Sequence, residues 1–271
     1  MPNAAPVYYR FMTGPRFAAI AHDLRERIAL GEYSQLSHLE SEAELGARYA
    51  VSRPTVRRAL ELLRDEGIVE SRPGAGWFVT GAAYHQRLAL GTFRHAPSAM
   101  RDAGGDVART VVDFAFRPAP AAIASLLGLA RHDSVLAAQS VRTVDGEFLD
   151  VAHEWVPAAF AGGISRDTAA DPGIWATLGR SGRHVATVHQ TITAGLASAA
   201  DAELLHTSPG VPLLLVRRVA SDADGIPLAL SDHRYLAHRF ALEVEFHSGP
   251  AAAAVDPPGL RAVPPLEEKL S

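Results

Sequence analysis

Residues 50–67 of this chain read AVSRPTVRRALELLRDEG and predict one amphipathic helix. Ser52 is a favourable N-cap because its hydroxyl can accept a backbone N–H of the first turn, and Pro54 costs little this early in a helix. Gly67 supplies the stop. The apolar residues follow the i, i+3, i+4, i+7 spacing of a buried stripe: Val56, Ala59, Leu60 and Leu63. The helix therefore has one face to bury and another face rich in arginine.

Four arginines lie outside that stripe: Arg53, Arg57, Arg58 and Arg64. Guanidinium groups on successive turns at an exposed helix N-terminus can reach base edges and phosphates in the major groove of DNA. The alternative is a solvated basic face, which is the commoner role of an isolated charge cluster. The residues around the helix decide between these two interpretations.

The neighbouring residues predict a winged helix-turn-helix. Apolar residues with helical period over 17–30 predict a first helix, and Ser41 with Glu44 forms an S-x-x-E capping box for a second helix that ends near Tyr49. Residues 50–52 then lead directly into the arginine helix, which is helix-turn-helix spacing. Two β-prone runs, 68–72 and 77–80, flank a glycine-rich turn and predict a hairpin wing.

These motifs resemble the winged helix-turn-helix of GntR-type bacterial transcription regulators. The similarity covers Leu39-Glu40-Ser41-Glu42, the recognition helix from Val51 to Leu60, and the wing from Glu66 to Gly76. Glu40 stands where the family usually has proline, and Ala43 stands where many members carry a DNA-contacting arginine. The resemblance implies base and phosphate contacts by Arg53, Thr55 and Arg57, with Gly74 at the wing tip in the minor groove. Arg58 joins this expected DNA-binding set from the arginine cluster.

Composition bounds the remaining possibilities. A chain of 271 residues suggests two domains, and its net charge of −4 means that attraction to DNA must come from where the charges lie. The absence of cysteine excludes disulfides and thiolate chemistry and fits a reducing cytosol. The sequence has neither an apolar run of roughly 18 residues nor a signal segment. We therefore expect a cytoplasmic protein that does not enter a membrane.

Residues 88–246 predict a largely antiparallel sheet with short helices. Asp145-Gly146 and Asp224-Gly225 are strong hairpin turns, and each hairpin follows a predicted helix, at 121–129 and at 198–206. This helix–strand–turn–strand unit occurs twice, which indicates a pseudo-repeat whose two halves enclose a pocket. The predicted strands are 107–116, 135–143, 147–155, 185–194, 213–221 and 226–235.

This part resembles the UTRA effector-binding domain of HutC-like GntR regulators, whose fold is similar to chorismate lyase. The motifs that carry the similarity are Met100-Arg101-x-x-Gly104, Leu126-Leu127-Gly128-Leu129, Arg142-x-x-Asp145-Gly146, His189-Gln190-Thr191-Ile192 and Tyr235-x-x-x-Arg239-Phe240. The resemblance implies an α+β protein with a winged DNA-binding domain at 16–81, a linker at 82–87 and an effector-binding domain at 88–246. We expect residues 1–15 to be flexible and residues 247–271 to be disordered.

The expected effector pocket differs from that of the phosphosugar-binding members of this family. Positions where those members carry arginine, serine, tyrosine and glutamate read Ser140, Gly173, Trp175 and Ala152 here. We therefore expect a small, singly charged or neutral polar metabolite whose binding depends on Arg142. The expected effector contacts are Arg94, His95, Arg142, Glu154, Trp175, Ser231, His233 and Tyr235.

Ordinary structural roles compete with these assignments. Arg142 suits a surface salt bridge, and Glu154 or His233 suits a solvated strand position. The twelve histidines lack metal-binding spacing, and neither a nucleophile elbow nor a phosphate loop is present, so we expect no metal and no cofactor.

Two functions remain. The first is a ligand-responsive regulator, expected to be a repressor that binds a pseudo-palindromic DNA operator as a homodimer. The second is a chorismate-lyase-like enzyme tethered to a DNA-binding module, for which the sequence nominates no general acid or base. The first interpretation is preferred, and no enzymatic activity is expected.

Overall fold

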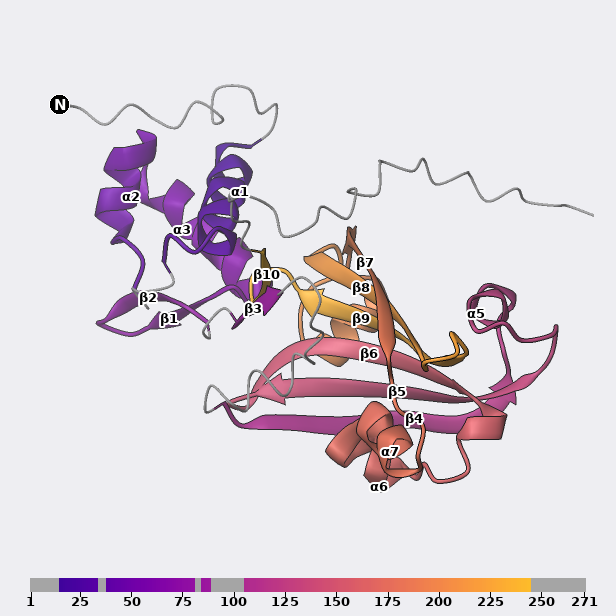
Figure 1. The fold of residues 1–271 in the computed structure, drawn as a ribbon. Helices are drawn as coiled ribbons and strands as arrows, with labels where there is room; N and C mark the ends of the chain where they lie inside the picture. Colours follow the sequence, from indigo (N-terminus) through magenta and orange to yellow (C-terminus); the bar gives the residue numbers. More distant parts are fainter. Residues whose placement is uncertain (1–14, 34–37, 81–83, 89–104, 245–271) are drawn as a thin grey trace, which may run out of the picture.

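The computed structural model of the chain describes residues 15–33, 38–80, 84–88 and 105–244 (Figure 1). Three helices and a hairpin form the N-terminal part, and a long twisted sheet dominates the C-terminal part. The α+β class and the largely antiparallel sheet expected from the sequence are confirmed.

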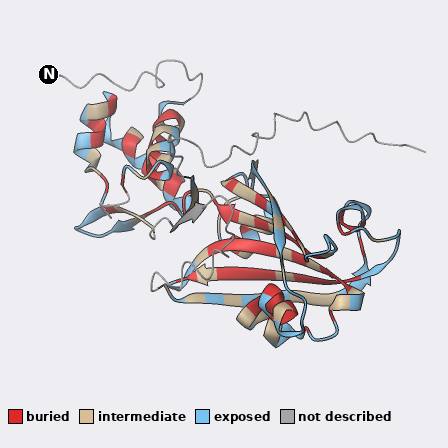
Figure 2. Cartoon of the chain, in the orientation of Figure 1, coloured by how far each residue is buried: buried red, intermediate tan, exposed pale blue. Residues whose placement is uncertain are grey.

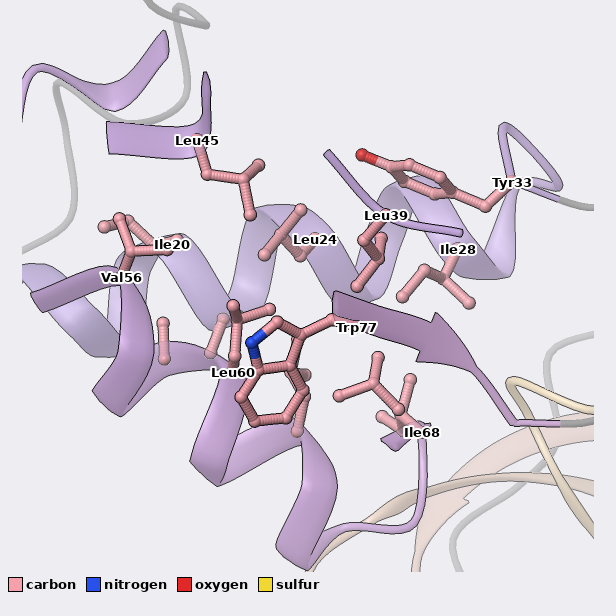
Figure 3. Close-up of a cluster of buried hydrophobic side chains, with 14 of the residues drawn as sticks. Ile20, Leu24, Ile28, Tyr33, Leu39, Leu45, Val56, Leu60, Ile68 and Trp77 are labelled. Carbon is pink, nitrogen blue, oxygen red and sulfur yellow. The ribbon is translucent and has the colours of Figure 1, made fainter. Parts of the chain in front are cut away.

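The N-terminal part is a winged helix-turn-helix. Its elements are α1 (Arg16–Ala29), α2 (Glu42–Tyr49), α3 (Arg53–Asp65), β1 (Val69–Arg72) and β2 (Gly76–Val79). The apolar stripe predicted for α3 is buried: Val56, Ala59, Leu60 and Leu63 are all 0% exposed. Figure 3 shows that Trp77 of the wing packs into the same core as the helices. Because burial of one large aliphatic side chain stabilises by roughly 1.5–3 kcal/mol, this core fixes α3 and leaves its arginine face outside.

Local signals decide where these helices begin and end. Ser41 Oγ accepts the backbone N–H of Glu44 at 3.2 Å and the Glu44 carboxylate accepts the Ser41 N–H at 2.8 Å, so the predicted capping box is confirmed. Gly67 follows α3 with a φ of 75°, a conformation that favours glycine. The capping hydrogen bond expected of Ser52 is wrong. Its hydroxyl lies 3.0 Å from the Thr55 hydroxyl, and this side-chain contact replaces a bond to the backbone.

Six strands form one antiparallel sheet in the order β4-β5-β6-β9-β8-β7. Their bounds are β4 (Val107–Pro118), β5 (Ser134–Val144), β6 (Glu147–Pro157), β7 (Thr187–Leu196), β8 (Pro212–Ser221) and β9 (Pro227–Leu236). Asp145 and Gly146 both have positive φ in the turn between β5 and β6, as the predicted hairpin requires. Figure 2 shows that the central strands of this sheet are the most deeply buried.

The sheet is built from the two repeated units that the sequence predicts. Helix α5 (Ala121–Leu126) precedes the β5–β6 hairpin, and helix α8 (Ala199–Leu205) precedes the β8–β9 hairpin. Each helix packs across to the other unit, α8 against β6 and α5 against β9. The two units do not close over a pocket as separate layers, because β6 and β9 pair directly and join them into one continuous sheet. Their shared seam therefore carries side chains from both units on the same face.

A short helical layer, which the sequence pattern does not predict, covers one face of the sheet. It contains α6 (Arg166–Thr168), η3 (Ala169–Gly173) and α7 (Ile174–Arg180), and it follows the single turn η2 (Ala158–Phe160). Residues of α7 form an apolar cluster with residues of β5 and β6. We call this side of the sheet the α7 face. The opposite side packs against α5 and α8 and is called the α8 face.

The residues expected to form a plain linker include a strand. Strand β3 (Tyr84–Leu88) pairs in parallel with β10 (Phe240–Val244), with Tyr84 opposite Phe240. This two-stranded sheet is separate from the six-stranded one. The local pattern of residues 82–87 carries no signal for a strand because the partner comes from the other end of the C-terminal part.

The turn after α8 contacts the end of the arginine helix. Thr207 Oγ1 donates a hydrogen bond to the Glu66 carbonyl at 2.7 Å, and the Ser208 hydroxyl donates to the Asp65 carbonyl at 2.8 Å. The last carbonyls of a helix have no partner within it, so these two hydroxyls complete α3 from the C-terminal part of the chain. Helix α3 is thereby held at the end opposite Arg53.

Candidate functional site

The arginine face of α3 is open to solvent. The side chain of Arg53 is 70% exposed and that of Arg57 is 60% exposed, and both lie beside Glu42 of α2. Arg57 donates from Nε and Nη2 to the two carboxylate oxygens of Glu42 at 3.0 Å each, while Arg53 Nη2 lies 3.7 Å from Glu42 Oε2. The hydrogen bonds from Arg57 hold the pKa of Glu42 below its ordinary value. The first two turns of α3 thus present one guanidinium group fixed by two hydrogen bonds and a second that makes a longer ion-pair contact with the same carboxylate.

The other expected DNA contacts lie around this helix and on the wing. Thr55 is in the first turn of α3, where its hydroxyl meets Ser52. Arg58 extends toward α1, where its guanidinium carbon lies 4.3 Å from the centre of the Phe17 ring. Gly74 is exposed in the turn of the wing with a φ of 75°. Arg53, Thr55 and Arg57 therefore share the first turns of α3, and Arg58 lies against a different helix.

Buried polar side chains gather on the α7 face, where β6 meets β9. Three adjacent cross-strand rows contain them: Arg142–Asp150–Tyr235, Ser140–Ala152–His233 and Ala138–Glu154–Ser231–Arg218. Every polar member of these rows is at most 6% exposed. The alternation of side chains along a strand explains why residues two apart share this face. The structure therefore brings Arg142, Glu154, Ser231, His233 and Tyr235 onto one face.

Arg142 is committed to a buried ion pair. Its Nε and Nη2 donate to the two carboxylate oxygens of Asp150 at 2.6 Å each, and the two side chains are 1% and 0% exposed. Burial opposes the charge on Asp150, but the Arg142 guanidinium outweighs that effect and holds the pKa of the carboxyl well below its usual range. Removing one partner of a buried pair costs about 3–5 kcal/mol, because the other charge is left uncompensated. Arg142 is thus a fixed part of the face and not a surface salt-bridge partner.

His233 joins this ion pair as a neutral ring. Its Nδ1 lies 2.9 Å from Asp150 Oδ2 and 3.1 Å from Arg142 Nη2. The two hydrogens of Nη2 are used by Asp150 and by the Tyr235 hydroxyl at 3.1 Å, so Nδ1 donates its own hydrogen to the carboxylate. Burial lowers the pKa of His233 to about 3. The ring is therefore uncharged at neutral pH.

Two hydroxyls beside this network are unsatisfied. Ser140 Oγ and Ser231 Oγ are buried and make no hydrogen bond within the part of the chain that the structure describes. Leaving such a group unpaired costs roughly 1–3 kcal/mol. Their neighbour Glu154, by contrast, accepts a hydrogen bond at 3.0 Å from Arg109 of β4. The α7 face therefore offers polar atoms that can pair with a bound molecule next to ion pairs that are already complete.

Three further effector contacts were expected from the sequence, and only one of them lies within the described residues. Trp175 of α7 is 8% exposed and belongs to the apolar cluster between α7 and the α7 face of the sheet. Arg94 and His95 lie outside the described residues. Sequence reasoning missed Asp150 and Arg109 as partners, because cross-strand neighbours follow only from the register. The spacing of Ser140 two residues before Arg142 was the one available signal that it shares their face.

A separate groove of about 290 Å³ opens mainly on the α8 face, where it borders β7, β8 and β9. Its charged groups pair with one another or with α8: Arg217 donates to Asp232 at 2.7 and 2.6 Å, and Arg234 lies 3.4 Å from Asp201. His233 contributes to the lining, although its ring joins the network on the other face. The groove is thus distinct from the buried polar rows.

Metal-ligating side chains do not assemble in groups of three or more anywhere in the described ranges. Among the helices in those same ranges, none is long and apolar enough to cross a membrane.

Known protein families match both parts of the chain. Residues 17–79 match the family described as bacterial regulatory proteins, gntR family, and residues 102–241 match the UTRA domain. The chain belongs to the GntR family of bacterial regulators and, within it, to the members that carry a UTRA domain. The family expected from the sequence is confirmed, and the protein is a ligand-responsive, DNA-binding transcription regulator.

Named relatives resemble this chain over most of their length. The transcriptional repressor PhnF of Mycolicibacterium smegmatis is 26% identical over 208 residues, which cover 77% of this chain and 84% of that protein. The transcriptional repressor NagR of Bacillus subtilis is 24% identical over 237 residues, covering 87% and 92%. The crystal structure of PhnF from Mycobacterium smegmatis covers 85% of this chain and 100% of its own, with a TM-score of 0.56 at 24% identity, and shows the same fold.

The buried histidines predict how stability depends on pH. His233 and His238 both have a pKa lowered to about 3, chiefly by burial, whereas an unfolded histidine titrates near 6.5. Between those values the unfolded chain binds protons that the native state does not, so the free energy of unfolding falls as pH drops from about 6.5 toward about 3. His233→Asn keeps an N–H donor for Asp150 and should reduce this slope by about 1.4 kcal/mol per pH unit.

Urea unfolding at pH 7, 6, 5 and 4 measures that slope in the wild type and the variant. His22→Asn, at a half-exposed position on α1, serves as the control substitution. An identical slope in wild type and His233→Asn would contradict the assignment of a neutral, buried ring.

Proposed function

We propose that this regulator is a cytoplasmic, homodimeric repressor whose operator binding is controlled by a small metabolite on the α7 face. Two relatives are named as transcriptional repressors, which supports repression over activation. The two unsatisfied hydroxyls of Ser140 and Ser231 are the observation that carries the effector site. The contacts of Thr207 and Ser208 with the end of α3 support a direct mechanical link between the two domains, 16–81 and 88–246.

DNA recognition is proposed to use Arg53, Thr55 and Arg57 in the major groove, with Gly74 of the wing in the minor groove. Exposure of the two arginine side chains supports this assignment, because both are accessible at the N-terminal end of a helix whose opposite face is fully buried. Arg58 lies against Phe17 and is proposed to contact a phosphate from the side of the helix. Phosphate contacts carry no sequence information, whereas a guanidinium fork on a base does.

This division predicts different outcomes for two arginine substitutions. Arg53→Ala should cost about 1–3 kcal/mol on operator DNA and little on random DNA, because a base contact is lost. Arg58→Ala should weaken binding to both DNAs by a similar factor. Fluorescence anisotropy with an operator duplex selected by the wild-type protein and a random duplex of equal length measures both. Equal losses on the two duplexes for Arg53→Ala would refute the base contact.

The homodimer is proposed because a single winged domain reads one half-site, and two copies double the phosphate contacts of a protein with net negative charge. Both outer strands of the sheet also expose apolar side chains, among them Phe116 of β4 at 54% and Leu196 of β7 at 69%. Exposed apolar strands at a sheet edge are suited to association with a second copy.

Light scattering at micromolar concentration should therefore give twice the chain mass of 28.8 kDa. Nuclease footprinting should give a protected region of two half-sites related by two-fold symmetry. A monomer that protects one half-site would show the proposal to be wrong.

The effector is proposed to be a small neutral or singly charged polar molecule. Glu154, Ser231, His233 and Tyr235 would orient its polar groups, with Arg142 holding that set in place. Arg94, His95 and Trp175 stay in the proposed site from the family resemblance alone. Arg142 and Arg109 are each committed to a carboxylate, so neither can bind an anionic group without giving up an existing ion pair. The buried Arg218 of β8, opposite Ser231, donates instead to the neutral side chain of Gln190 at 2.7 Å, and a single cation of this kind suits a singly charged molecule.

Removal of the unsatisfied Ser231 hydroxyl should have opposite effects on the stability of the ligand-free protein and on ligand binding. Ser231→Ala removes an unpaired buried group, so the protein without ligand should become more stable by about 1 kcal/mol. Its response to ligand should weaken. Ser198→Ala is the matched control, since that hydroxyl caps α8 and its loss should destabilise by about 1 kcal/mol.

A thermal-shift screen of wild type and Ser231→Ala tests the proposed effector site with free sugars, monocarboxylates and sugar phosphates. A compound at 100 times its dissociation constant stabilises the protein by about 2.7 kcal/mol, which such a screen detects. Stabilisation by sugar phosphates alone, or an unchanged response of Ser231→Ala, would refute the proposed site.

We propose that the domain binds its ligand without converting it. A general base must be free to take a proton, whereas Asp150 and Glu154 are each engaged by an arginine. Chromatography of any stabilising compound after incubation checks this, and appearance of a product would favour the chorismate-lyase-like alternative.

A further inference from the structure

A carboxylate from α2 lies between the exposed arginines at the N-terminal end of α3. Glu42 is the first residue of α2, and its side chain is 12% exposed, while the arginines that flank it are 70% and 60% exposed. A negative charge at a DNA-binding surface repels phosphates and weakens association. We therefore expect a role of Glu42 that offsets the weaker attraction to DNA.

Glu42 connects three elements of the DNA-binding domain. Its carboxylate accepts both hydrogen bonds of the Arg57 fork, lies 3.7 Å from Arg53 Nη2, and accepts a 3.4 Å hydrogen bond from the Trp77 indole of the wing. The side chains of α2, α3 and β2 therefore converge on one carboxylate. Arg57 uses Nε and Nη2 for this contact, and its guanidinium plane is fixed by two parallel hydrogen bonds.

We propose that Glu42 is a positioning residue that determines the specificity of operator recognition. It orders the guanidinium groups of Arg57 and Arg53 before DNA arrives, so that less side-chain freedom is lost when they bind. It also lowers the affinity for DNA that offers phosphates alone. Operator DNA binds more tightly because the guanidinium groups are already ordered for its bases. Random DNA makes no such base contacts, so for it the negative charge of Glu42 only repels the phosphates.

The chain offers a control of the same charge on the same helix. Glu44 lies two residues further along the first turn of α2 and is exposed, and its carboxylate closes the capping box with Ser41. Glutamine also serves at this position of a capping box, so Glu44→Gln removes one negative charge and keeps the helix start. Glu42→Gln removes the same charge and disrupts the fork, because its amide nitrogen cannot accept from Arg57.

The two variants should therefore differ in discrimination. Glu44→Gln should tighten binding to operator and random duplexes by the same factor, which leaves their ratio unchanged. Glu42→Gln should tighten binding to random DNA similarly but lower the operator-to-random ratio by about tenfold. Dissociation constants on both duplexes at two salt concentrations measure this. Equal ratios for Glu42→Gln and Glu44→Gln would overturn the positioning role.

The variant Glu42→Asp tests whether the position of the carboxylate matters apart from its charge. It keeps the net charge of the wild type but has a shorter reach, so random-DNA affinity should stay at the wild-type level while the ratio falls. A ratio equal to that of the wild type would also overturn the proposal. Thermal unfolding of each variant without DNA shows whether the domain is folded, and Glu42→Asp keeps the test valid if Glu42→Gln does not fold.

The role of Glu42 rests on the proposed DNA contacts of Arg53 and Arg57. The variant Arg57→Ala shows whether a negative result rejects the role of Glu42 or the DNA contacts themselves. Loss of discrimination in Arg57→Ala combined with an unchanged ratio in both Glu42 variants would reject the role of Glu42 and keep the contact. An unchanged ratio in Arg57→Ala and Arg53→Ala would reject the contacts themselves.

Discussion

The buried ion pair between Arg142 and Asp150 is the constraint on which the effector domain depends. Two charges removed from water are costly unless their geometry is good and their remaining hydrogen bonds are filled. Here both oxygens of Asp150 accept from Arg142, and the His233 ring and the Tyr235 hydroxyl complete the network. These residues come from β5, β6 and β9, so a shift in the register of any of these strands would leave a buried charge unpaired. The pair therefore selects one alignment at the seam between the two repeated units.

The DNA-binding domain uses a similar arginine–carboxylate fork in a different environment. Arg57 and Glu42 are 60% and 12% exposed, whereas Arg142 and Asp150 are 1% and 0% exposed. Solvent competes with the outer pair, and its contribution to stability is correspondingly small. The guanidinium of Arg57 stays accessible to a phosphate or a base edge there, because its pair with Glu42 is not enclosed in a dry interior. The same chemistry holds a sheet together in one domain and keeps an arginine available in the other.

Local signals predict much of this fold, and long-range contacts explain what they omit. The capping box at Ser41 and the stripe on α3 depend on residues within two turns of each other, and both were evident in the sequence. The strand at Tyr84–Leu88 and the ion pair of Arg142 depend on partners that only the tertiary structure supplies. The layer from α6 to α7 includes η3, whose five residues are two alanines, an aspartate, Pro172 and a glycine, a composition without helical period. For the effector site, strand alternation correctly groups Ser231, His233 and Tyr235, but it does not reveal that Arg142 is already bound to Asp150.

The pairing of β3 with β10 also sets an order of events as the chain is made. Residues 84–88 leave the ribosome long before residues 240–244, which form their parallel partner. At about 5–20 residues per second, that delay is on the order of ten seconds. The winged domain has its whole core within residues 20–77 and can fold during this interval. Strand β3 must wait, unpaired, until nearly all of the effector domain has been synthesised. A nascent chain therefore presents a finished DNA-reading module before it has the means to respond to a metabolite.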